Sequence, residues 1–160
     1  MKKCLVFIFL IPFGVYGQSY MKATTGIVNI YPLIELNITS LMSDLVNFSS
    51  PLDYNQDKIV NAQYDVSIKS NQPWVVTVRS NAHVFTASGG GSADVPVSYV
   101  GLRKHNTLPF IQLTTSPQML LTNENINVVN NYLLDLKVSP PWDYHGGTFT
   151  TTLLFTASHQ

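Results

Sequence analysis

Two C-terminal runs of this chain alternate apolar and polar residues with a period of two. In residues 131–138 the apolar face carries Tyr132, Leu134, Leu136 and Val138. In residues 147–157 the corresponding face carries Phe149, Thr151, Leu153, Phe155 and Ala157. A period of two is typical of strands that bury one face. Two strands cannot cover that face by themselves, so the rest of the chain must supply a second sheet.

Two earlier runs, residues 59–70 and 74–80, repeat the alternation. We expect the inward positions to be Val60, Ala62, Tyr64, Val66 and Ile68 in the first run and Trp74, Val76 and Val78 in the second. The residues between them, Asn61, Gln63, Asp65, Ser67 and Lys69, are expected to face outward, as is Asp135 in the C-terminal pair. Because Asn71, Gln72 and Pro73 form a turn signal, we predict that the two runs form a hairpin.

Shorter strands are expected in residues 26–38, 95–103, 110–113 and 118–121, and no segment has the pattern of an amphipathic helix. Pro32 makes the first of these an edge strand or two short strands. The sequence therefore predicts an all-β fold, a single antiparallel immunoglobulin-like β-sandwich of seven to nine strands.

The N-terminus has the order of a secretory signal peptide. Met1, Lys2 and Lys3 form a positive region, residues 4–13 are apolar, and small residues precede Gln18. We therefore expect a signal peptide over residues 1–17 and a β-sandwich domain over residues 18–160. The apolar run is too short to span a bilayer, so no membrane span is expected in the mature chain.

The amino-acid composition limits the kinds of partner that the chain can bind. Nine basic and nine acidic residues give a net charge of zero, which leaves no basic patch for nucleic acid. The one cysteine, Cys4, lies in the expected signal peptide, so the mature chain has no disulfide and no thiol ligand or nucleophile. Low charge with many Thr and Asn residues suits an extracellular β-protein, or one that associates with copies of itself.

The connector between the two C-terminal runs holds the candidate contact residues, Trp142, Asp143, Tyr144 and His145. Exposed aromatic side chains such as Trp142 and Tyr144 stack on sugar rings or on a partner protein. The alternative is that Trp142 folds back over the end of the core. A carbohydrate-binding module is therefore the second functional hypothesis.

No residue pattern indicates an enzyme, a cofactor or a metal site. Asp143 and His145 are close in sequence, but a metal would need a third ligand such as Asp94 or His105. Ser98 and Ser116 lack the Gly-x-Ser-x-Gly surroundings of a nucleophile elbow. We expect no catalytic, cofactor-binding or metal-binding residues.

Two stretches resemble bacterial surface proteins of the WxL and fimbrial types. Residues 72–78 (Gln-Pro-Trp-Val-Val-Thr-Val), followed by Phe85 and Val95-Pro-Val97, resemble their central hairpin, and residues 131–138 with 146–156 are similar to their closing pair. Both Trp-x-x triplets lack the Leu of a true Trp-x-Leu motif, so peptidoglycan attachment is not implied. The resemblance implies a non-enzymatic structural or adhesin-like protein at the cell surface or in the periplasm of a bacterium.

Such a protein would act through its edge strands and end loops, on other copies of itself, on cell-surface proteins or on glycans. Residues 26–38 raise a specific alternative for assembly. This segment either pairs within its own subunit, which the sequence favours, or completes the sheet of a neighbour by strand addition.

Overall fold

The computed structural model describes residues 27–123, 129–140 and 143–160. The chain divides into two units, residues 1–30 and residues 31–160. The expected signal peptide lies outside the described residues. The second unit holds all the strands of the described residues and is the sandwich domain considered below.

The described part of the chain contains ten strands, somewhat more than predicted, and two short 3-10 helices. The strands are β1 (Ile34–Ser40), β2 (Lys58–Ser70), β3 (Trp74–Ser80), β4 (Thr86–Ser88), β5 (Val100–Lys104), β6 (Ile111–Gln112), β7 (Gln118–Asn123), β8 (Asn130–Val138), β9 (Thr148–Thr150) and β10 (Leu153–His159). The 3-10 helices are η1 (Pro51–Asn55) and η2 (Val97–Tyr99). None of these described helices has the length and hydrophobicity needed to cross a membrane.

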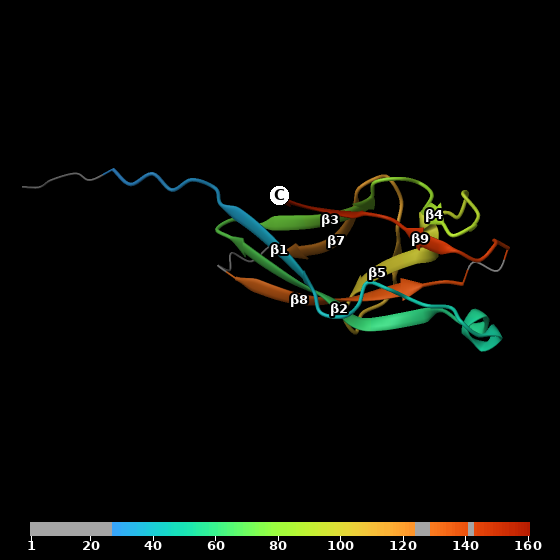
Figure 1. Ribbon diagram of the computed structural model, residues 1–160. Coiled ribbons are helices and arrows are strands. Elements are labelled where there is room, and N and C mark those ends of the chain that lie inside the picture. The colour runs from blue at the N-terminus through green and yellow to red at the C-terminus, as the bar shows by residue number, and fades with distance from the viewer. Residues whose placement is uncertain (1–26, 124–128, 141–142) are drawn as a thin grey trace, which may run out of the picture. The chain divides into compact units, whose positions relative to one another are not determined.

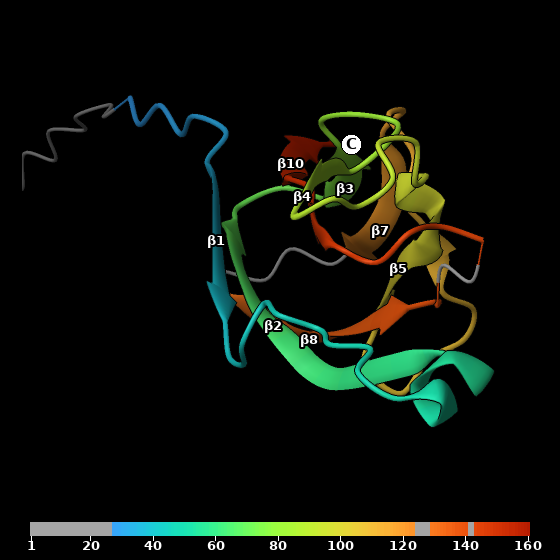
Figure 2. The same ribbon diagram turned by 45° about the vertical axis from the view of Figure 1, so that its right-hand side comes forward.

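The strands form an antiparallel sandwich, as the sequence predicts. One sheet has the order β1-β2-β8-β5-β6 and the other the order β10-β3-β7, while β4 and β9 form a separate pair. Figures 1 and 2 show the two layers, with β1 and β10 on one side of the sandwich and β5 and β7 on the other.

The predicted hairpin of residues 59–70 and 74–80 is wrong. β2 pairs with β1 and β8, whereas β3 pairs with β10 and β7. Residues 71–73 carry the chain from one layer to the other, so the apolar faces of β2 and β3 meet across the core. The alternation identified both strands, but it does not specify which strand lies beside which.

The two C-terminal runs also lie in different sheets. β8 lies between β2 and β5, and β10 pairs with β3. The single strand expected over residues 147–157 is divided at residues 151–152 into β9 and β10. Its inward side chains still follow the predicted face, with Leu153, Phe155 and Ala157 packed against the core.

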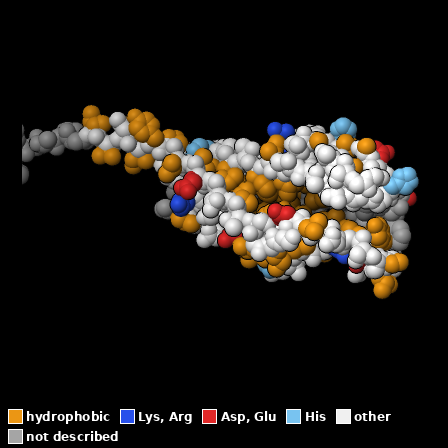
Figure 3. All heavy atoms as spheres, in the orientation of Figure 1, with side chains coloured by type: hydrophobic (Ala, Val, Ile, Leu, Met, Phe, Trp, Pro, Cys, Tyr) orange, Lys and Arg blue, Asp and Glu red, His pale blue; other side chains and the backbone are white. Residues whose placement is uncertain are grey.

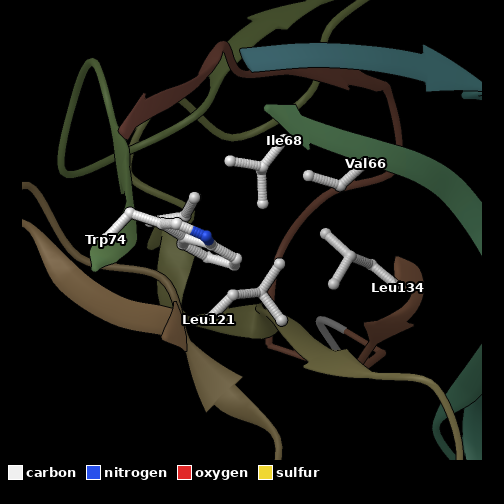
Figure 4. Packing of buried hydrophobic residues seen from close by; sticks show 6 residues of the cluster. Val66, Ile68, Trp74, Leu121 and Leu134 are labelled. Carbon is white, nitrogen blue, oxygen red and sulfur yellow. The ribbon is translucent and has the colours of Figure 1, made fainter. Parts of the chain in front are cut away.

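The core forms where the two sheets face each other. One cluster consists of Val66, Ile68, Trp74, Val76, Leu121 and Leu134, all nearly or fully buried. Figure 4 shows the Trp74 indole extending from β3 toward Ile68 and Leu121. Its ring also meets Tyr132 edge-on, with 5.9 Å between centroids. Trp74 is therefore the large buried anchor that the sequence indicates.

A bulge in β2 overturns the prediction for Gln63. The β2–β8 register shifts between Val60 and Tyr64, and Ala62 has a φ of 52°. At this bulge Gln63 is fully buried, and its Nε2 donates to Asp44 Oδ1 at 2.8 Å and to Ser40 Oγ at 3.0 Å. The bulge adds two residues to β2 between Val60 and Tyr64, so Val66 and Ile68 keep the predicted inward face, and period-two reasoning fails at the bulge itself.

Asp135 is also buried, contrary to the expectation of a solvated outer face. Its Oδ1 accepts a hydrogen bond from the Ala62 amide at 2.9 Å and lies 2.6 Å from His105 Nδ1. Its Oδ2 accepts from Arg103 Nε at 2.9 Å. The Asp135 carboxylate thus links the β2 bulge to β5, and these contacts shield the carboxylate from solvent.

Candidate interaction site

The outer edge of β10 carries no strand in the described part of the chain. β10 pairs along its other side with β3, from Leu153 opposite Ser80 to His159 opposite Trp74. An unpaired edge presents backbone N–H and C=O groups that can pair with another chain. The edge of β10 is therefore a ready template for strand addition.

Core side chains beside this edge are incompletely covered. Phe155 and Ala157 of β10, and Leu36 and Ile38 of β1, pack on the buried cluster but are themselves only partly buried. Figure 3 shows hydrophobic atoms within a hollow between the two layers, on the side where β1 and β10 run. An added strand with apolar side chains on one face would cover them.

The strand order shows what is missing beside β10. An immunoglobulin constant-type sandwich has strands A-B-E-D in one sheet and C-F-G in the other. Here β1-β2-β8-β5 follows the first order, and β3 with β10 follows C and F. The position of strand G, on the free side of β10, is unfilled among the described residues.

An exposed apolar segment precedes β1. We call residues 27–33 the N-terminal arm. Its apolar side chains are Ile27, Val28, Ile30, Tyr31 and Leu33, and each is between 61% and 85% exposed. Apolar residues scattered singly on a surface are ordinary, but a continuous exposed run marks an interaction segment.

Asn71 holds the C-terminal end of the arm. Its side-chain Oδ1 accepts from the Leu33 amide at 2.8 Å, and its Nδ2 donates to the Tyr31 carbonyl at 2.8 Å. The Asn71 amide also donates to the Leu33 carbonyl at 3.3 Å. The sequence marked Asn71 only as a turn residue, and no pattern in the sequence pointed to this contact.

The connector that the sequence singled out lies at a different place. Trp142 is outside the described residues, while Asp143 and His145 are exposed. Tyr144 meets Tyr99 edge-on, with 6.1 Å between ring centroids. Burial and the neighbouring Tyr99, Asp94 and Asp143 raise the pKa of Tyr144. Among the described residues, the Tyr144 ring therefore packs on Tyr99 of its own domain.

His145 ties this connector to residues 88–92. The His145 amide donates to Ser92 Oγ at 2.9 Å, and the Ser92 amide donates to the His145 carbonyl at 3.5 Å. Asp143, Tyr144 and His145 line neither of two surface hollows, of about 510 and 180 Å³. The contacts of Tyr144 and His145 therefore support loop packing and give no specific support to a sugar platform.

Titratable groups also gather around Asp135. Burial alone would raise the pKa of Asp135, but hydrogen bonds from Ala62, His105 and Arg103 outweigh this effect, and the pKa is lowered.

His83 and Ser98 line the smaller hollow, but no hydrogen bond joins their side chains in the described structure. No cluster of three metal-ligating side chains occurs among the described residues, and Asp143 and His145 gain no third ligand there.

No protein-family model matches the chain, and no curated protein matches its sequence.

Proposed function

We propose that this chain is a secreted, non-enzymatic structural protein of bacterial cell surfaces that assembles from copies of itself. The N-terminal arm of one copy adds as a strand along the free edge of β10 in the next copy. The observation that carries the proposal is the pairing of an unfilled strand position with an exposed apolar segment in the same chain.

Side-chain periodicity supports the fit of the arm. Val28 and Ile30 share the parity of Ile34, Leu36 and Ile38, the residues by which β1 meets the core. In an extended arm these two side chains point to one face and would enter the hollow beside β10. Main-chain hydrogen bonds would provide the affinity, and the alternate side chains would set the register.

The part of the arm that is free of its own subunit is shorter than this edge. Asn71 bonds to Tyr31 and Leu33, which leaves residues 27–30 to pair with a neighbour. These residues extend about 13 Å at roughly 3.3 Å per residue, whereas the seven residues of β10, Leu153–His159, extend about 23 Å. The described part of the arm can therefore cover about half of the free edge of β10.

Export and composition support an extracellular setting. The chain begins with the pattern of a signal peptide, and charged residues make up 11% of it. A surface with few charges has weak self-repulsion, which favours association between copies. Protease accessibility on intact cells of the source bacterium would test this location.

The test of assembly is the size of the purified mature protein across a concentration series, measured by size-exclusion chromatography with light scattering. We expect the mass to rise with concentration, and negative-stain images to show chains of subunits. Replacing Ile30 by Asp should hold the protein at the monomer mass, because a charge would enter the apolar hollow.

The matched control is Asn29→Asp, which adds the same charge on the opposite face of the arm. It should assemble like the wild type. A wild-type protein that stays monomeric at its highest soluble concentration would refute the proposal, and so would equal effects of the two substitutions.

A further inference from the structure

Four oxygen atoms at the C-terminal end of β1 and in the loop after it converge on the side-chain amide of Gln63. Gln63 Nε2 lies 2.8 Å from Asp44 Oδ1, 3.0 Å from Ser40 Oγ, 3.2 Å from the Met42 carbonyl oxygen and 3.4 Å from the Ser43 carbonyl oxygen. An amide nitrogen carries only two hydrogens. This end of β1 therefore presents more acceptors than the nitrogen can satisfy, and they all face one position.

The other end of the same amide has no partner. Gln63 is fully buried, and its Oε1 accepts no hydrogen bond from the described residues. A buried polar atom without a partner is costly, so its presence calls for a physical explanation. A half-turn of the amide about the Cγ–Cδ bond exchanges Nε2 with Oε1, and Oε1 then faces the four converging oxygens. A cation among these oxygens would favour that orientation.

The negative charge of this group is not balanced by a basic side chain. In the part of the chain that the structure describes, no Lys, Arg or His forms an ion pair with Asp44. Burial, the charge of Asp44 and a hydrogen bond with it raise the pKa of Tyr64 to about 12, so Tyr64 stays neutral beside the carboxylate. The group thus has one uncompensated negative charge, which a bound cation would neutralise.

We propose that Ser40, Met42, Ser43, Asp44 and Gln63 bind a calcium ion. Calcium takes about six to eight oxygen ligands, drawn from carboxylates, backbone carbonyls, Gln or Asn side chains and water. The side chains of Ser40, Asp44 and Gln63 would each supply one oxygen, two backbone carbonyls would supply two more, and water would complete the set. Groups of three His, Cys, Asp or Glu side chains do not occur among the described residues, so this site uses neutral oxygens around one carboxylate.

The kind of ligand favours calcium over magnesium. Magnesium requires a nearly regular octahedron and gives up its water reluctantly, whereas calcium accepts irregular sets of carbonyl oxygens. Residues 40–44 are exposed, so an ion can enter from solvent, and the buried Gln63 closes the inner side. Because alternation places Gln63 on the outer face of β2, the sequence alone gives no sign of this site.

A site with a single carboxylate is weak. We expect a dissociation constant between about 0.1 and 1 mM, the range of extracellular calcium modules. The test is the melting temperature of the mature protein in a CaCl2 series, with MgCl2 as the comparison. Calcium at about 10 mM should raise the melting temperature by roughly 5 °C, and the same concentration of magnesium by less than about 1 °C. No response to calcium, or an equal response to magnesium, would overturn the proposal.

Substitution of Asp44 shows whether the ion lies at this place. Asp44→Asn keeps an oxygen but removes the charge, and it should weaken calcium binding at least about tenfold. Asp143→Asn, at another exposed aspartate, is the matched control and should leave the calcium response unchanged. Equal calcium responses of the wild type and Asp44→Asn would overturn the proposal.

Substitution of Gln63 separates a calcium ligand from a structural amide. Gln63→Glu presents an oxygen in either orientation and adds a second carboxylate, so it should bind calcium roughly tenfold more tightly. Without calcium this variant should melt below the wild type, because two carboxylates then lie close together, and calcium should restore it. Gln72→Glu adds the same charge at an exposed position and should leave calcium binding unchanged.

A purely structural Gln63 predicts a different result. Gln63→Glu would then lose its hydrogen bonds to the loop, and calcium would not restore the melting temperature, which would overturn the proposal. If Gln63→Glu does not fold, the comparison of Asp44→Asn with the wild type still decides, because Asp44 is exposed.

Discussion

Asp135 illustrates how one buried side chain can organise parts of the chain that are distant in sequence. It receives hydrogen bonds from Ala62 in β2 and from Arg103 in β5, and it lies against His105 just beyond β5. A charge at full burial is tolerated only when it is paired and hydrogen-bonded. The sequence places Asp135 on the outer face of β8, and alternation alone gives no sign that a bulge and two basic residues cover it.

Replacing Asp135 by Asn should destabilise the fold by about 3 kcal/mol at neutral pH, because Arg103 would lose its carboxylate partner at a mostly buried position. Asp65→Asn, on the neighbouring strand β2, is the control and should change stability by less than about 0.5 kcal/mol. Urea unfolding of the three proteins measures both differences.

The pH dependence of stability follows from the lowered pKa of Asp135. An aspartate in the unfolded chain titrates near pH ~3.9. Because the folded-state pKa is lower, Asp135 contributes stability above that pH and loses it as the pH falls through the folded pKa. Wild-type stability should therefore drop below about pH 4 more steeply than that of Asp135→Asn. Parallel curves would show that Asp135 does not titrate differently in the folded state.

At the scale of elements, the sequence predicts which segments are strands better than it predicts how they pair. Alternation located β2, β3, β8 and β10 because each buries one face against the core. It could not show that residues 71–73 cross between sheets. Pairing depends on which faces meet across the core, and a local pattern does not contain that information.

Part of the candidate site could likewise be predicted from the sequence, and part of it could not. Pro32 and the alternation after it indicated an edge strand, and the structure places β1 at a sheet edge. The free edge of β10 could not be predicted, because it depends on the order of strands in both sheets. Gln63 and Asn71 were missed because their roles arise from a bulge and from a corner between layers.

The β4–β9 pair allows a test of one close backbone approach. A Cβ on Gly147 would lie 2.5 Å from Gly91 Cα and 2.7 Å from the Ser88 carbonyl oxygen. Both are backbone atoms, so Gly147→Ala should cost about 1–3 kcal/mol through forced displacement of the loop. A Cβ on Gly146 meets nothing within 4 Å, so Gly146→Ala is the matched control. Equal melting temperatures for the two variants would contradict this packing.

At the scale of the molecule, the sandwich has a buried core but an unequal distribution of edges. β1 covers one end of the five-stranded sheet, while β10 ends the three-stranded sheet without a neighbour in the described structure. Natural proteins usually protect such an edge from unwanted pairing. Here the chain also carries an exposed apolar arm, and we therefore propose that the free edge is a binding surface.

Hydrogen exchange of individual backbone amides shows whether the free edge of β10 becomes paired on assembly. We would compare assembled wild-type protein with the monomeric Ile30→Asp variant, using β7, an edge strand on the opposite side of the sandwich, as the internal reference. We expect slower exchange on assembly in the arm and along β10, with β7 unchanged. Unchanged exchange in β10, or new protection at β7 instead, would contradict it.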